Sequence, residues 1–211
     1  MKRFQMITEA DARVLDYGEH VILVAGGHIT PLAHDTLKAR RVSIVREGVD
    51  VDAESLAPPS EIRTVAIAGD HTGVALKKAI LQHLRGRGIA VHDLGTNTSE
   101  PVDYPDTAAF VAVQVSRGEA DAGIVIDGAG LGSTIAANKV RGVRAAMCLN
   151  QTLARYARQH NGANVLALGS TLVTRDEALA IVDTFLGTPM REARYIRRLA
   201  KIRDLERRPP V

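Results

Sequence analysis

A glycine-rich loop is the strongest chemical feature of the chain. Residues 127–133 read Asp-Gly-Ala-Gly-Leu-Gly-Ser and follow the continuous apolar run Ala122–Ile126. Glycines let backbone N–H groups approach a ligand closely, and the N-terminus of a following helix adds a positive dipole. The loop therefore suits a phosphate, or an oxyanion that develops during a reaction. The alternative is a tight turn between a strand and a helix.

Two common nucleotide-binding patterns do not fit this loop. The third glycine of a G-x-G-x-x-G pattern would fall on Ser133, and Cys148 and Asn150 stand where that pattern needs an acidic residue. A Walker-type loop needs Gly-Lys-Ser or Gly-Lys-Thr, which the chain lacks. The sequence thus excludes a dinucleotide fingerprint and a Walker loop.

Acidic residues and histidines stand at the ends of predicted elements. Asp127 ends a strand and faces the loop, so its carboxylate can serve as a general base; the alternative is a helix N-cap. Asp70 and His71 follow an earlier strand, where His71 can bind phosphate, move protons or be structural. His160 and Asn161 close a predicted helix, where the helix dipole favours a cation.

Two arginines near the C-terminus have the spacing of a phosphate grip. Arg194 and Arg198 are four residues apart, so they share one helix face and can bind an anion with two guanidinium groups. Residues 191–211 carry eight Lys and Arg against three Asp and Glu, and the rest of the chain is slightly acidic. The net charge of +3 is therefore a property of this helix, whose alternative role is a solvated face.

The composition excludes several function classes. The chain has 211 residues, 45% apolar and 24% charged, as in a soluble globular protein. It has no Trp, four Tyr and three Phe, which argues against an aromatic platform for nucleic acid or carbohydrate. The single Cys148 excludes a disulfide framework, and the histidines show no metal-ligand spacing. We expect a cytoplasmic protein without metal, cofactor, membrane or nucleic-acid partner.

Short apolar runs alternate with helical patterns from residue 64 onward. This alternation is typical of an α/β domain in which helices cover both faces of a parallel sheet, a Rossmann-like three-layer fold. Ligands bind such sheets beyond the carboxyl ends of the strands, so the residues after each strand should lie together. We predict strands at 64–69, 89–94, 122–126, 144–148 and 165–168. We predict helices at 73–86, 106–116, 131–139, 151–159, 174–187 and 191–206.

The segment Pro58-Pro59-Ser60, preceded by a polar stretch, indicates a linker. We therefore divide the chain into a small N-terminal extension, residues 1–57, and a main domain, residues 62–211. Within the extension, we predict a helix that starts near Thr8, a strand at 21–25 and a helix at 29–40. The extension is too short for its sequence to predict an independent core.

Four stretches of the main domain resemble the ribose-5-phosphate isomerase B and galactose-6-phosphate isomerase family. They are residues 65–73, Asp103-Tyr104-Pro105, residues 123–140, which include Ile135-Ala-Ala-Asn-Lys139, and residues 158–169. The resemblance implies an isomerase that interconverts aldose and ketose phosphates through a cis-enediolate, without metal or cofactor. It also implies homodimers or homotetramers whose sites are shared between subunits.

The resemblance also assigns roles by position. Gly128, Gly130 and Gly132 would hold the enediolate oxygens through their N–H groups, and His160 would assist ring opening. Arg194 and Arg198 would hold the phosphate of the sugar. The other residues that would bind substrate are Asp70, His71, Tyr104, Ala129, Leu131, Ser133, Asn138 and Asn161.

The chain departs from the family at the position of the base. Many members have Cys where this chain has Asp127, and a second subgroup has Glu at the position of Ser133. Ser133 cannot replace that Glu, and Ala129 replaces a common Thr. Our hypothesis is that Asp127 is the enediolate base, because carboxylates perform the same proton transfer in unrelated isomerases. The alternatives are a sugar-phosphate binding or assembly protein, an isomerase of another sugar phosphate, or an epimerase-like or dehydrating variant.

The extension has a resemblance of its own. Residues 7–13 and 28–33 are similar to the start of ethanolamine-utilisation cobalamin adenosyltransferases, and related segments accompany enzymes of bacterial microcompartments. This resemblance implies that residues 1–57 bind a shell or cargo partner, rather than cobalamin. The alternative is a lineage-specific extension that packs on the oligomer.

Overall fold

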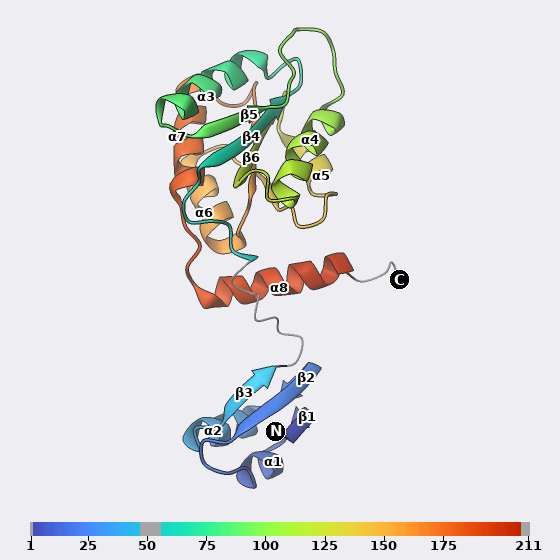
Figure 1. Ribbon diagram of the computed structural model, residues 1–211, viewed down its shortest axis with the longest axis vertical. Coiled ribbons are helices and arrows are strands. Elements are labelled where there is room, and N and C mark those ends of the chain that lie inside the picture. Colours follow the sequence, from blue (N-terminus) through green and yellow to red (C-terminus); the bar gives the residue numbers. More distant parts are fainter. Residues whose placement is uncertain (1, 47–55, 208–211) are drawn as a thin grey trace. The chain divides into compact units, whose positions relative to one another are not determined.

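The computed structural model describes residues 2–46 and 56–207 (Figure 1). The chain divides into two compact units, Met1–Ala53 and Glu54–Val211. The sequence predicts a linker at residues 58–60, and the structure groups this segment with the second unit. The predicted extension is therefore a few residues longer than the first compact unit.

The second unit contains a five-stranded sheet with the strand order β5-β4-β6-β8-β7, and every neighbouring pair is parallel. The predicted parallel sheet is confirmed. The strands are β4 Thr64–Gly69, β5 Ala90–Asp93, β6 Ala122–Asp127, β7 Ala145–Met147 and β8 Val165–Gly169. The helices are α3 Val74–Gly86, α4 Tyr104–Ser116, α5 Leu131–Ala137, α6 Gln151–Asn161, α7 Arg175–Gly187 and α8 Ala193–Arg207.

Apolar side chains fill both faces of this sheet, as a three-layer fold requires. On one face, side chains of α3, α6 and α7 pack against alternate residues of the strands, such as Ile124 and Leu166. On the other face, α4 and α5 pack against the residues between them, such as Val125 and Ala167. Strands buried on both faces explain the continuous apolar runs in the sequence.

Helix α8 packs at one end of the second unit and not on a face of the sheet (Figure 1). Its residues Tyr195 and Leu199 form a small apolar cluster with Met190, and Leu56 and Ala57 pack against this cluster. These two residues directly precede the predicted linker at 58–60, and from here on residues 56–61 are called the linker. Because the linker contacts α8, it helps to fix the position of the helix.

The first unit is a three-stranded parallel sheet with the order β1-β2-β3. Its elements are β1 Lys2–Ile7, α1 Glu9–Arg13, β2 His20–Ile29, α2 Pro31–Ala39 and β3 Ser43–Arg46. The predicted central strand and both helices are present, and Thr8 caps α1 as a capping box. The unit buries its own apolar cluster, which includes Ile7, Leu15 and Leu23.

Candidate active site

Three loops meet at the carboxyl ends of β4, β6 and β8. The amide of Asp70 donates to the carbonyl of Ile126 at 2.9 Å, and the amide of Ser170 donates to the carbonyl of Asp127 at 2.8 Å. These bonds join the first residue after β4 and the first residue after β8 to the end of β6. The structure therefore brings Asp70, Asp127 and the glycine-rich loop together, as the strand pattern predicts.

The Asp127 carboxylate is buried, with 5% of the residue exposed. Its Oδ1 accepts hydrogen bonds from the amides of Ala129, at 2.8 Å, and Gly130. Its Oδ2 accepts from the amide of Ser133 at 2.8 Å. A carboxylate offers about four acceptor positions, so three are occupied and one on Oδ2 remains. Asp127 thus fastens the loop and keeps one acceptor position open. The alternative that Asp127 is a helix N-cap is wrong, because the N-cap of α5 is Gly130.

The remaining amides of the loop lie beside this carboxylate. In the described part of the chain, no hydrogen bond reaches the amides of Gly128, Leu131 and Gly132. The amides of Ala129, Gly130 and Ser133 are occupied by Asp127 itself. The loop therefore offers three N–H groups to a ligand. Gly128 and Gly132 are among them as predicted, but Gly130 is not, because its amide bonds Asp127, and Leu131 supplies the third.

Two glycines of the loop are required by close contacts. Gly130 has φ +75°, and a Cβ on it would lie 3.0 Å from the amide nitrogen of Gly169. A Cβ on Gly132 would lie 2.6 Å from the ring of Tyr104. Tyr104 therefore lines the loop, as expected, with 42% of the residue exposed.

The loop after β4 presents His71 next to a fixed carboxylate. Asp70 Oδ1 accepts from the amide of Thr72 at 2.9 Å and from its hydroxyl at 2.6 Å. His71 is partly exposed, and its Nδ1 lies 3.4 Å from the amide of Val102, which donates to it. This bond leaves Nε2 as the ring nitrogen that can face a ligand.

The other loop and helix residues of the prediction have varied positions. Leu131 is exposed at the start of α5, whereas Ser133 is fully buried and its hydroxyl has no partner among the described residues. Asn138 lies at the opposite end of α5, where its side chain bonds to backbone atoms of Thr134 and Ala145. The structure therefore does not bring Asn138 to the loop.

Sequence reasoning missed two threonines that hold these loops in place. The amide and hydroxyl of Thr171 both donate to the carbonyl of Gly128, at 3.1 Å and 2.7 Å. The hydroxyl of Thr72 donates to Oδ1 of Asp70, and it accepts a hydrogen bond from the hydroxyl of Ser170 at 3.3 Å. Their positions directly after β8 and β4 are the signal that could have identified them. We call Asp70, His71, Tyr104, Asp127 and the loop the carboxyl-edge group.

A second group of predicted residues gathers around Tyr195 of α8. The ring of His160 lies 4.6 Å from the Tyr195 ring, between centroids. Nη2 of Arg194 donates to the Tyr195 hydroxyl at 2.9 Å, and Cζ of Arg198 lies 5.5 Å from the Tyr195 ring centroid. We call His160, Asn161, Arg194, Tyr195 and Arg198 the amino-edge group.

Glu192 also shapes the amino-edge group. Its Oε2 lies 2.6 Å from Nε of Arg194. This hydrogen bond and the negative charge of Glu192 raise the pKa of Arg194 above its ordinary value. Arg194 therefore carries a full positive charge at all ordinary pH values, and its Nη atoms face the neighbouring groups.

The two groups lie at opposite ends of the sheet within one chain. Strands β6 and β8 pair in parallel from Gly123 and Val165 to Asp127 and Gly169. Asp127 ends its strand, whereas His160 precedes β8, so at about 3.3 Å per residue the strands alone separate these ends by about 13 Å. In Figure 1, α8 lies near the start of β4, and the loop between β5 and α4 lies at the other end.

The single cysteine is not part of either group. Cys148 follows β7 and is 1% exposed, and burial raises the pKa of its thiol to about 11. It is therefore protonated near neutral pH. Among the described residues, no group of three His, Cys, Asp or Glu side chains is arranged to hold a metal ion. No helix in residues 2–46 or 56–207 is long and apolar enough to cross a membrane.

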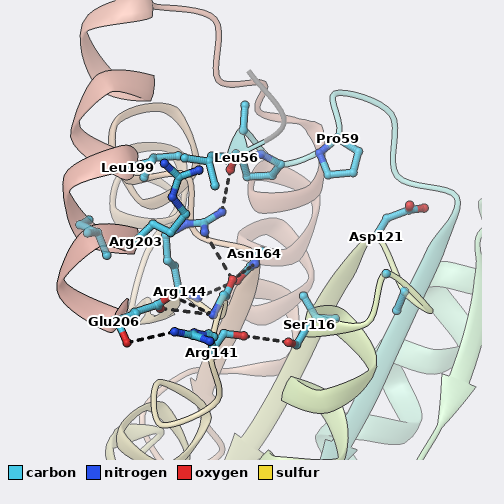
Figure 2. Close-up of a pocket in the computed structure, with 17 residues that line it drawn as sticks. Leu56, Pro59, Ser116, Asp121, Arg141, Arg144, Asn164, Leu199, Arg203 and Glu206 are labelled. Carbon is cyan, nitrogen blue, oxygen red and sulfur yellow. Dashed lines mark hydrogen bonds between the residues drawn. The ribbon is translucent and has the colours of Figure 1, made fainter. Parts of the chain in front are cut away.

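A pocket of about 550 Å³ lies at the amino end of the sheet, between the linker, the end of α4 and α8 (Figure 2). Arg144 crosses it and donates to the carbonyls of Leu56, at 2.9 Å, and Gly162, at 2.7 Å. None of the predicted site residues lines this pocket. Its hydrogen bonds attach the linker to the second unit.

Comparisons with known proteins match the second unit to one family. The family described as Ribose/Galactose Isomerase matches residues 65–202. Ribose-5-phosphate isomerase B of Escherichia coli (strain K12) is 44% identical over 147 residues, which cover 70% of this chain and 99% of that protein. The N-terminal unit lies outside the matched family region.

Solved structures give the same result. Ribose-5-phosphate isomerase B of Clostridium thermocellum is 49% identical, with a TM-score of 0.67 over 68% of this chain and 97% of that chain. The enzyme of Mycoplasma genitalium, solved with bound ribulose-5-phosphate, is 44% identical, with a TM-score of 0.67 over 69% of this chain and 97% of that chain. The chain belongs to the ribose/galactose isomerase family of sugar-phosphate isomerases.

Proposed function

We propose that this protein is an aldose–ketose isomerase that interconverts ribose 5-phosphate and ribulose 5-phosphate, or a close relative of this pair, with Asp127 as the base. The observation that carries the proposal is the geometry of Asp127, whose carboxylate is held by three amides and keeps one acceptor position on Oδ2. This position lies in a loop with three further N–H groups. The relative solved with ribulose-5-phosphate supports the choice of substrate.

The proposed reaction needs one proton-transfer group and a set of N–H donors. Oδ2 of Asp127 takes the proton from C2 of the open-chain aldose, and the electron pair forms the C1–C2 double bond of the cis-enediolate. The C1 carbonyl oxygen takes up the negative charge of the enediolate. The carboxyl group then returns the proton to C1 and the proton of the C2 hydroxyl passes to O1, so that C2 becomes the carbonyl of the ketose and C1 carries the hydroxyl. The amides of Gly128, Leu131 and Gly132 stabilise the negative oxygens, as donors in an oxyanion hole do.

A second copy of the chain completes the site in this proposal. Within one chain the carboxyl-edge group and the amino-edge group lie at opposite ends of the sheet, so one copy supplies the base and another supplies His160 and the arginines. Exposed apolar residues on α5 and α6, such as Ile135 and Leu153, support an interface between copies. The smallest assembly is a homodimer with two equivalent sites, and a homotetramer would contain two such pairs.

In this proposal the amino-edge group opens the sugar ring and binds the phosphate. His160 transfers protons during opening of the sugar ring, with Asn161 beside it. Arg194 and Arg198 bind the phosphate as charged donors, together with His71 of the other copy. Phosphate contacts made far from C1 and C2 fix the sugar so that C2 meets Asp127.

The experiment that tests this function is an isomerisation assay on four-, five- and six-carbon aldose and ketose phosphates, with Asp127→Asn as the main variant. Asn keeps the shape of the side chain but lacks the base, so we expect turnover to fall about 10²- to 10⁴-fold while phosphate binding is retained. A variant that isomerises near the wild-type rate would contradict the role of Asp127. Wild-type binding without turnover would favour the alternative, a catalytically inactive sugar-phosphate binding or assembly protein.

We also propose that the N-terminal unit binds a shell or cargo partner of a bacterial microcompartment. Its helices connect consecutive parallel strands, so right-handed crossovers place both on one face of the sheet. Val21 and Leu23 are buried on that face. Ile22 and Val24 alternate with them along the strand, so they point to the opposite face, where they are only partly buried. This opposite face is the surface that we propose for the partner. Removing residues 1–55 should abolish co-localisation with a shell and keep isomerase activity. Collapse of the oligomer would instead indicate that the unit packs on it.

A further inference from the structure

Tyr195 is the residue at which the proposed ring-opening group and the proposed phosphate ligands meet. It is 8% exposed on α8. Its hydroxyl accepts from Arg194 at 2.9 Å, and Cζ of Arg194 lies 4.6 Å from its ring centroid. The same ring contacts Arg198 and His160. We propose that Tyr195 is a positioning residue that sets the geometry of the phosphate-binding arginines and of His160 together.

The two arginines need such a residue because of their charge and freedom. Arg194 and Arg198 are one helical turn apart, so their positive charges repel each other when no phosphate is bound. Arginine side chains also have many rotamers, and binding must fix them. The Tyr195 ring offers its negative face to both guanidinium groups, and its hydroxyl fixes one Nη of Arg194. The tyrosine therefore orders the arginines before the phosphate arrives.

His160 lies between two tyrosines that differ in their surroundings. The ring of Tyr156 stacks on it at 4.7 Å with an interplanar angle of 16°, and the ring of Tyr195 lies on it at 4.6 Å with an angle of 32°. Tyr156 is 47% exposed and lies under Arg155, whereas Tyr195 is buried and lies under both Arg194 and Arg198. A change at Tyr156 therefore tests the orientation of His160 by itself, whereas a change at Tyr195 tests His160 together with the two arginines.

Tyr195 is itself held firmly, as a positioning residue must be. Its amide donates to the carbonyl of Glu192 at 2.9 Å at the start of α8. Its ring belongs to the apolar cluster with Met190 and Leu199, against which Leu56 and Ala57 pack. Packing in this cluster restricts the ring, so it presents a defined surface to His160 and the arginines.

This inference rests on the proposed function, and its test measures binding as well as turnover. Three variants separate the contacts. Tyr195→Phe removes only the hydroxyl, Tyr195→Leu removes the ring, and Tyr156→Leu removes the other ring that contacts His160. Tyr17→Leu is the matched control, because Tyr17 lies under Arg41 in the N-terminal unit at 5.7 Å and is 65% exposed.

We would measure kcat and KM for ribose 5-phosphate, and the affinity for inorganic phosphate by calorimetry. Tyr195→Phe should raise KM and weaken phosphate binding about two- to fivefold with kcat nearly unchanged, since one hydrogen bond from the exposed Arg194 guanidinium is lost. Tyr195→Leu should weaken phosphate binding about tenfold and also lower kcat. Tyr156→Leu should lower kcat and leave phosphate binding unchanged. Tyr17→Leu should match the wild type.

The outcomes separate this inference from the proposed function. Phosphate binding by both Tyr195 variants that equals the wild type would overturn the inference, even if the protein is an active isomerase. A Tyr195→Phe variant that loses kcat and keeps its phosphate affinity would also overturn it, because Arg194 is the hydrogen-bond partner of the hydroxyl within the described residues. If the wild type binds phosphate without isomerising any sugar, the proposed function fails, and the phosphate affinities of the variants still decide the role of Tyr195.

Discussion

The carboxyl-edge group acts through backbone amides, whereas the amino-edge group acts through long charged side chains. In the first group, Asp127 and Thr171 bond directly to the backbone of the loop, and close neighbours leave no room for a Cβ on Gly130 or Gly132. In the second group, Arg194 and Arg198 lie on an exposed face of α8 and depend on the ring of Tyr195. The first group is therefore set by chain geometry, and the second by contacts between side chains.

This difference predicts that small backbone changes harm the first group most. Gly130→Ala would place a Cβ 3.0 Å from the backbone of Gly169 at a φ of +75°. The strain costs about 1–3 kcal/mol, and a displaced loop should lower kcat about 100-fold. The matched control is Gly118→Ala, since Gly118 has φ +71° with nothing within 4 Å. This control should be less stable than the wild type in thermal unfolding but should keep the wild-type kcat in the isomerase assay. Equal activity of both variants would contradict the prediction.

The amino-edge group should respond to loss of charge and not to backbone change. Arg198→Leu removes a charged donor to phosphate, which is worth about 1.5–3 kcal/mol, so KM should rise about 10- to 100-fold. Arg197→Leu is the control on the same helix, because Arg197 is exposed and the arginines that lie over Tyr195 are Arg194 and Arg198. Steady-state kinetics on the two variants checks this. Similar KM values would mean that α8 does not bind phosphate.

The carboxyl-edge group could be predicted from the sequence, and so could every member of the amino-edge group except Tyr195. Strands buried on both faces leave apolar runs, so the residues after β4 and β6 can be located by pattern alone. The position of Tyr195 between His160 and two arginines depends on how α8 packs on α6, which no local pattern encodes. The N-terminal strand β1 was also missed, because its sequence Lys-Arg-Phe-Gln-Met-Ile is largely exposed and polar.

The role of Asp127 in the loop could not be predicted from the sequence either. Its position at the end of a strand is compatible with a general base and with a helix N-cap. The structure places Gly130 at the N-cap of α5, and the Asp127 carboxylate instead bonds three loop amides and keeps the open acceptor position that the proposed base needs. Hydrogen-bond directions around a turn depend on backbone angles that the residue types leave open.

The linker should affect the amino-edge group more than the carboxyl-edge group. Arg144 bonds the carbonyl of Leu56, and the buried Arg158 bonds the carbonyl of Pro59 at 3.1 Å. Burial lowers the pKa of Arg158 to about 10 because the charged guanidinium loses its contact with water. The carbonyl of Pro59 replaces one of those water contacts. Removing residues 1–61 should destabilise the protein by about 2 kcal/mol and raise KM about three- to tenfold.

Removing residues 1–55 is the control for the linker, because it spares these contacts. Solved relatives consist almost entirely of the matched domain, so the second unit should fold without the first. We expect this shorter deletion to keep the wild-type KM. Thermal unfolding and kinetics on both deletions provide the check, and identical KM values would show that the linker does not support α8.

The smallest effect should come from the cysteine. Because burial raises the pKa of Cys148 to about 11, only about one thiol in a thousand is ionised at pH 8. Iodoacetamide at pH 8 should therefore leave isomerase activity unchanged, whereas it should inactivate relatives that use a cysteine base. Rapid loss of activity, with a label at Cys148 in the mass spectrum, would assign this thiol a role in the site.

The central claim is that one site contains the carboxyl-edge group of one copy and the amino-edge group of another. The direct test is to co-express Asp127→Asn and Arg194→Leu/Arg198→Leu chains with different tags and to purify the mixed dimers. One of their two sites then has both groups intact, so we predict up to about half of the wild-type activity from two nearly inactive parents. Mixed dimers that are no more active than their parents would contradict a shared site.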